Sequence, residues 1–157
     1  MTWPLGIDEI RQLVDERALE PVQPGGDLAD HLLEEARQHL ASAQVVLDVG
    51  DHTGAYQLAY DALRKTAVAL LAVQGLRATS RGGHVAVERA VGAQFVVAVP
   101  AFASFRRLRR NRNRFEYPGS VSTGPSEDDV IDAITTADDA LAQARILLGG
   151  GDLDRWI

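Results

Sequence analysis

The stretch that most constrains the fold covers residues 53–74, the most alanine-rich and apolar segment of the chain. Its apolar residues recur at helical spacing, and further alanines spread onto the remaining faces; the spaced set is Ala55, Ala59, Ala62, Leu63, Ala67, Leu70 and Leu71. A helix that is apolar nearly all round has to be surrounded by other elements, and small residues let those neighbours approach closely. The segment therefore predicts the central helix of a bundle.

Five other segments have the same helical periodicity, and stretches rich in glycine or proline separate them. The predicted helices cover residues 7–18, 27–49, 53–74, 84–99, 102–116 and 126–148. Residues 95–99 also have strand propensity, but helix is favoured there because no second strand is predicted to pair with them. We predict an all-α fold, an up-and-down bundle of four to five helices with a short N-terminal helix. It forms a single domain over residues 1–157 with its core at 27–148.

Composition limits the class of protein. Apolar residues make up 46% of the 157 positions, as in ordinary globular proteins, and cysteine is absent, which rules out disulfides and thiol chemistry. Because there is no long apolar run and no signal-peptide layout, we predict a cytoplasmic protein without a membrane segment. Phosphate-loop, dinucleotide and nucleophile-elbow motifs are absent, and the four histidines lack metal-site spacing. No cofactor and no metal are predicted.

Positive charge is concentrated in one predicted helix. Six of the sixteen basic residues lie within nine positions, and the other ten share the chain with twenty-two acidic residues; the six are Arg106, Arg107, Arg109, Arg110, Arg112 and Arg114. An acidic body with one basic stripe is typical of a binding site or of a self-complementary contact. The outward-facing arginines are predicted either to follow a phosphate backbone or to pair with acids such as Asp132.

Arg112 is the exception within this stripe, because the helical pattern places it among apolar residues. At 100° per residue it shares one face with Phe105, Leu108 and Phe115. A buried guanidinium must be paired or must line a polar cleft. Glu116, one turn further on, is its nearest possible partner. The sequence therefore leaves two interpretations open, a structural ion pair with Glu116 and an anion-binding cleft.

The stretch from Arg112-Asn113 to Tyr117 resembles the signature of the HEPN superfamily, small helical-bundle proteins of prokaryotic toxin–antitoxin and defence systems. That signature is an arginine, often followed by asparagine, and a histidine a few residues later. Position 117 holds tyrosine instead, and no histidine follows His84. The resemblance, which spans residues 27–148, implies a homodimer whose two motifs meet in a cleft. It also implies Arg112, Asn113 and Tyr117 as the catalytic candidates, with the arginine on the phosphate and no metal.

Further residues are candidates for the same cleft. Tyr60 and Asp61 lie along one side of the central helix and, with Glu116, are predicted to line it. The loop before the helix at residue 84 contains Arg77 and Arg81, and it is predicted either to bind an anion at the helix start or to form a plain glycine-rich turn. The predicted nucleic-acid-binding set is Arg106, Arg109, Arg110, Arg114, Arg77 and Arg81. His84 is interpreted as a surface residue at a helix start, or as a spatial substitute for the missing motif histidine.

These observations lead to two functional hypotheses. The first is an arginine-lined cleft that binds RNA, a nucleotide or a partner protein, in a degenerate toxin–antitoxin or defence module whose partner is a nucleotidyltransferase-type protein. The alternative is a metal-independent endoribonuclease that uses Arg112 and Tyr117. A free tyrosine has a pKa of about 10, so using it as a base at pH 7 costs about 4 kcal/mol that a histidine does not require. This cost favours the binding hypothesis.

Overall fold

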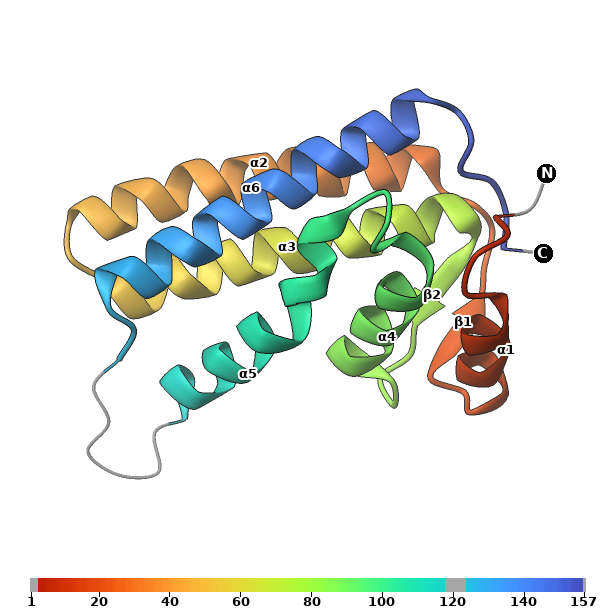
Figure 1. Ribbon diagram of the computed structural model, residues 1–157, viewed down its shortest axis with the longest axis horizontal. Helices are drawn as coiled ribbons and strands as arrows, with labels where there is room; N and C mark the ends of the chain where they lie inside the picture. The colour runs from red at the N-terminus through yellow and green to blue at the C-terminus, as the bar shows by residue number, and fades with distance from the viewer. Residues whose placement is uncertain (1–2, 118–123, 157) are drawn as a thin grey trace.

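The computed structural model describes residues 3–117 and 124–156. Its body consists of three long helices that lie side by side, α2 (Gly26–Asp48), α3 (His52–Gln74) and α6 (Glu127–Gly149) (Figure 1). Thirteen residues of α3 are buried, and this helix contacts α2, α4, α5 and α6. The alanine-rich segment is therefore the central helix, as its composition predicted, and the all-α bundle is confirmed.

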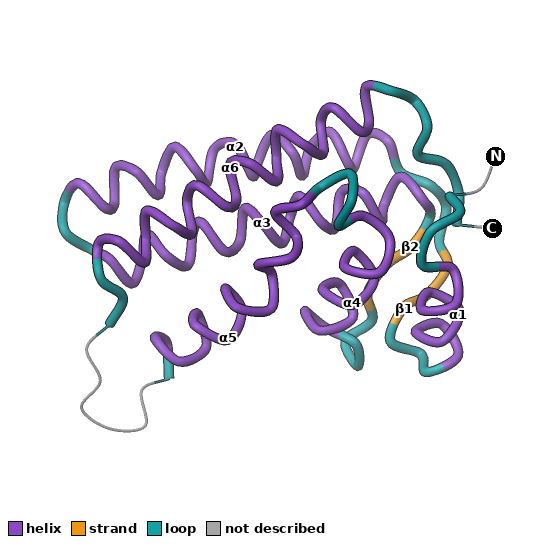
Figure 2. Tube along the Cα trace, in the orientation of Figure 1, coloured by secondary structure: helices purple, strands orange, loops and turns teal. Residues whose placement is uncertain are grey.

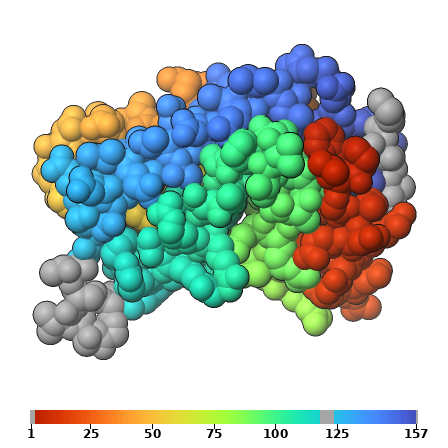
Figure 3. All heavy atoms as spheres, viewed as in Figure 1, coloured from red at the N-terminus to blue at the C-terminus, as the bar shows by residue number. Residues whose placement is uncertain are grey.

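The shorter elements lie along one side of this body. In chain order they are α1 (Ile7–Asp15), β1 (Leu19–Pro21), β2 (Leu76–Ala78), α4 (Gly83–Phe95), the 3₁₀ helix η1 (Pro100–Ser104) and α5 (Phe105–Glu116). In the space-filling view α5 and α4 form the lower part of the visible face, beneath α6 (Figure 3). No helix among the described residues is both long and apolar enough to cross a membrane.

A two-stranded antiparallel sheet joins the N-terminal segment to the end of α3 (Figure 2). Leu19 lies opposite Ala78 and Pro21 opposite Leu76. Gly75 ends α3 with a φ of 79°, and a β-carbon there would come within 2.7 Å of the Val22 carbonyl oxygen, so only glycine fits. We predicted no strands, and this was wrong because three-residue strands are too short to produce a recognisable alternation.

Several predicted helix boundaries were also wrong. The first helix ends at Asp15 rather than at 18, because Arg17 adopts a φ of 60° and turns the chain into β1. Helix α4 ends at Phe95 rather than at 99, and the residue before Pro100 is extended, as proline requires of its predecessor. The helix predicted over 102–116 is divided into η1 and α5.

Aromatic contacts fix α5 against α3. The Tyr60 and Phe105 rings meet edge to face at a centroid distance of 6.0 Å, and the Tyr56 and Phe115 rings do so at 5.2 Å. Phe105 and Leu108 have no exposed surface. Because Arg112 shares their side of α5, this packing turns its guanidinium towards α3.

Candidate functional site

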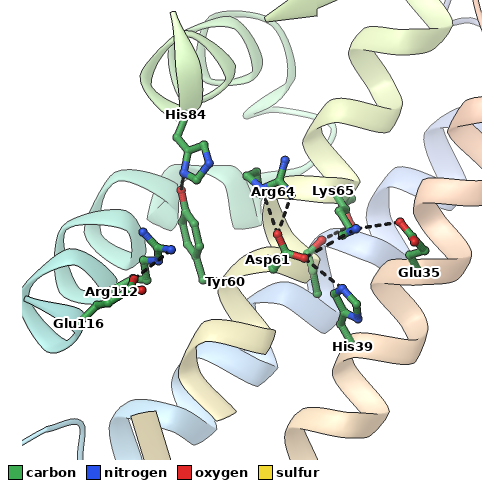
Figure 4. A network of polar contacts seen from close by, with 11 residues as sticks. Glu35, His39, Tyr60, Asp61, Arg64, Lys65, His84, Arg112 and Glu116 are labelled. Carbon is green, nitrogen blue, oxygen red and sulfur yellow. Dashed lines mark hydrogen bonds and ion pairs between the residues drawn. The ribbon is translucent and has the colours of Figure 1, made fainter. Parts of the chain in front are cut away.

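A pocket of about 270 Å³ lies where α3, the start of α4 and α5 meet. Three helices contribute its lining residues, which are Gly54, Gln57, Leu58, Tyr60, Asp61, His84 and Arg112. Figure 4 shows Tyr60 between Arg112 on α5 and His84 on α4. The pocket therefore combines a guanidinium, a phenol, an imidazole and a carboxylate from separate parts of the chain.

Arg112 is half-buried in this pocket, with 26% of its side chain exposed. Its Nη2 lies 3.0 Å from Glu116 Oε2, its Nη1 donates to Asn113 Oδ1 at 3.3 Å, and its guanidinium carbon lies 5.7 Å from the centre of the Tyr60 ring. The predicted ion pair with Glu116 is therefore present, and Arg112 also lines a pocket, whose binding of an anion stays a prediction. A guanidinium has five N–H donors, and these contacts leave several of them for a ligand.

Tyr60 and His84 form a hydrogen-bonded pair, with 3.0 Å between Tyr60 Oη and His84 Nδ1. Burial raises the pKa of Tyr60 to about 12, so the phenol stays protonated at neutral pH. The contact with Tyr60 removes part of the His84 ring from water, although the residue as a whole is exposed. This desolvation, with Arg64 and Arg112 acting in the same direction, lowers the pKa of His84 below 6.5. The imidazole is therefore neutral at pH 7.

Asp61 belongs to a charged network between α2 and α3 (Figure 4). Its carboxylate accepts a 2.6 Å hydrogen bond from Arg64 Nη2 and lies 3.0 Å from His39 Nε2. Lys65 Nζ lies 3.8 Å from the same carboxylate and donates to Glu35 at 2.7 Å. Since cations surround Asp61, its negative charge does not cancel the attraction of Arg112 for an anion.

The other arginines of α5 divide into two groups. Arg109 and Arg107 are each 2.6 Å from a carboxylate, Glu88 on α4 and Asp132 on α6 respectively, and so join α5 to its neighbours. Within the described residues, the other three have no carboxylate at ion-pair distance; these are Arg106, Arg110 and Arg114. Arg106 and Arg110 line a second open pocket of about 420 Å³, on the side of α5 away from Arg112.

A family model described as the HEPN domain matches residues 29–147, from the start of α2 to the end of α6. The chain belongs to the HEPN family. Comparisons with curated proteins and with solved structures gave no match. Membership of this family indicates a nucleotide- or RNA-related, ribonuclease-like role, because HEPN domains commonly bind RNA and dimerise.

The HEPN motif residues of α5 occupy different environments. Arg112 lines the pocket, whereas Asn113 is exposed and accepts a hydrogen bond from the Arg112 side chain. Tyr117 is the residue at which α5 ends; 72% of its surface is exposed, and it is not among the residues that line the Arg112 pocket. Within the described chain, the motif therefore contributes its arginine to this pocket without its tyrosine.

Arg77 and Arg81, predicted to bind nucleic acid, lie elsewhere in this HEPN domain. Arg77 donates from β2 to Glu20 on β1. Arg81 lines a third pocket together with Glu16 and Arg89. Neither residue lines the Arg112 pocket, so the fold separates this loop from the arginine helix.

Gln57 and His84 also line the pocket; Gln57 was not predicted, and His84 was predicted only as one of two interpretations. Gln57 lies one turn before Tyr60 and Asp61 on α3, and this helical spacing is the signal that identifies its face. His84 is the second residue of α4 and is exposed, as a surface residue at a helix start should be. It also lines the pocket, and its interpretation as a spatial substitute for the motif histidine stays a prediction.

Proposed function

We propose that this HEPN domain binds RNA or a nucleotide by a phosphate group held at Arg112. The observation that carries the proposal is a half-buried guanidinium with unused donors beside a pocket of about 270 Å³. Tyr60 and His84 add hydrogen-bonding groups to the same pocket. Charge-assisted hydrogen bonds from arginine to phosphate are among the strongest that proteins form.

The exposed arginines of α5 support a longer contact with an RNA backbone. Arg106, Arg110 and Arg114 point away from the bundle without an ion-pair partner among the described residues, so binding phosphate does not require them to break an ion pair within their own chain. Neutralised phosphates release counterions, which makes such binding weaker as salt rises. We assign Arg112 to the bound phosphate and these three residues to its neighbours along the strand.

In the cell, we infer, the domain acts as a binding module of the toxin–antitoxin or defence type. Its partners in this role are a second copy of the chain, an RNA or nucleotide, and a nucleotidyltransferase-type protein. The support is family membership together with the basic helix on an acidic body.

The experiment measures binding of a short single-stranded RNA, 2′-O-methylated so that it stays intact, to the wild type and two variants. Arg112→Gln should weaken binding about 10- to 100-fold, because a hydrogen bond to a charged group contributes about 1.5–3 kcal/mol. Arg37→Gln is the matched control, since Arg37 also pairs with a glutamate of its own helix but lies on α2. It should leave the affinity unchanged.

Equal affinities of the wild type and Arg112→Gln would contradict the proposal. A nucleoside triphosphate added as competitor separates the two ligand classes. If the triphosphate displaces the RNA at equal phosphate concentration, then the site binds a mononucleotide as well as an RNA strand. The absence of displacement would identify the strand as the ligand.

A further inference from the structure

His84 and Arg112 lie 28 positions apart in the sequence, on different helices, yet they line one pocket with Tyr60 between them (Figure 4). The imidazole is held by its Nδ1, which lies 3.0 Å from the phenolic oxygen. No described residue hydrogen-bonds to its Nε2. The pocket therefore presents a fixed cation and, near it, an oriented imidazole with one nitrogen available to a ligand.

We propose that His84 is a catalytic residue that accepts the proton of a ribose 2′-hydroxyl when RNA is bound at Arg112. The inference rests on the proposed function, because it needs a phosphodiester in this pocket. It gives the domain a cleavage activity beyond binding. It also assigns the proton transfer to α4 instead of to the end of α5, where Tyr117 lies.

The reaction uses only groups of the pocket, the RNA and water. The 2′-oxygen forms a bond to the adjacent phosphorus while the bond from phosphorus to the 5′-oxygen breaks. The 2′-hydroxyl proton passes to Nε2 of His84, and the departing 5′-oxygen takes a proton from water. His84 then returns its proton to the solvent. The products are a 2′,3′-cyclic phosphate and a 5′-hydroxyl, and nothing is oxidised or reduced.

Each pocket residue has a defined part in this step. Arg112 stabilises the negative charge that increases on the phosphate oxygens. Tyr60 is a positioning residue: its phenolic oxygen lies 3.0 Å from Nδ1, and the proposal assigns to His84 the tautomer with its proton on Nδ1 and its lone pair on Nε2. Desolvation of the ring, and then the guanidinium groups of Arg64 and Arg112, disfavour an imidazolium and keep this lone pair on His84 at neutral pH.

The test is cleavage of an unmodified single-stranded RNA by the purified protein in EDTA, with the ends of the products identified. His84→Asn is the main variant, since the asparagine amide retains a polar group at the position of Nδ1 but has nothing at Nε2. We expect cleavage to fall at least about 100-fold, the typical contribution of a general base, and this loss should exceed any loss of affinity for the 2′-O-methyl RNA measured on the same variant. His31→Asn, exposed on α2, is the control and should cleave like the wild type.

A second readout separates chemistry from structure. Added imidazole should restore cleavage to His84→Ala and leave Arg112→Gln inactive, because it replaces the missing base and not the cation. Wild-type protein that binds RNA without cleaving it would overturn the inference and leave the proposed function intact. Loss of cleavage in Tyr117→Phe with retention in His84→Asn would also overturn it. Failure to bind RNA at all would contradict the proposed function itself.

Discussion

Arg112 combines a structural ion pair with the ligand-binding role that we propose. Its position on the apolar side of α5 removes most of its side chain from water, and Glu116 supplies the counter-charge that such a site requires. The ion pair with Glu116 involves only Nη2 of the guanidinium. The other N–H donors of Arg112 can therefore bind an anion while the ion pair with Glu116 stays intact. An ion pair of this kind holds the cation ready in the pocket before a ligand arrives.

His84 makes a residue-scale prediction about stability and pH. Its lowered pKa means that the unfolded chain binds a proton at a higher pH than the folded chain does, so stability decreases as pH falls through 6.5 towards the folded value. The charges facing the ring are those of Arg64, Asp61, Arg112 and Arg109. His84→Asn removes this titration, so acidification from pH 7.5 to 5 should lower its urea midpoint less than that of the wild type. Parallel decreases in the two proteins would contradict the assignment.

At the scale of elements, the position of α4 decides where His84 lies. Gly82 precedes this helix, and a β-carbon at that residue would come within 2.1 Å of the Ala18 carbonyl oxygen at the end of α1 and the start of β1. Thr79 Nα donates to the same oxygen at 3.0 Å. The loop before α4 is thus held tightly against the N-terminal segment, and this contact sets the start of the helix.

Two glycine substitutions in this region should act in opposite directions. Gly82→Ala should lower the free energy of unfolding by about 1–3 kcal/mol, because the new methyl group would overlap the Ala18 carbonyl. Gly92→Ala, within α4 and with open space around the new methyl, should raise it by about 0.5–1 kcal/mol, since alanine favours the helix over glycine. Urea denaturation of both variants checks the prediction, and two changes of the same sign would contradict it.

At the scale of the whole molecule, charge is unevenly divided. Six arginines and no acidic residue lie at positions 106–114, whereas ten basic residues share the remainder of the sequence with twenty-two acidic ones. A surface of this kind can pair with another copy of itself, basic helix against acidic body. In a two-fold dimer such a contact would occur twice.

We therefore expect a homodimer held partly by the exposed arginines. Light scattering at micromolar concentration should return about twice the chain mass of 17.0 kDa. Arg106→Glu with Arg110→Glu should shift the equilibrium towards the single chain, because both replacements reverse the sign of the basic surface. Arg37→Glu, on α2, is the control and should leave the mass unchanged. A single-chain mass for the wild type would contradict the prediction.

The sequence by itself determined the class of fold. The alanine-rich segment required neighbours on all sides, and Ser126 with Asp129 forms the capping box that starts α6. These features depend on residues close together in the chain, where helical spacing and capping act directly. The pairing of Arg112 with Glu116 was predictable for the same reason, since both lie on one helix.

Only the tertiary structure decided which residues share the pocket. The short strands β1 and β2 pair across more than fifty positions, and His84 at the start of α4 meets Tyr60 of α3 across 24 positions. Arg77 and Arg81 looked equivalent to the arginines of α5 in charge, yet they lie beside Glu20 and Glu16 instead. Charge and periodicity describe each helix separately, whereas the direction in which α4 and α5 dock on α3 depends on packing between segments distant in sequence.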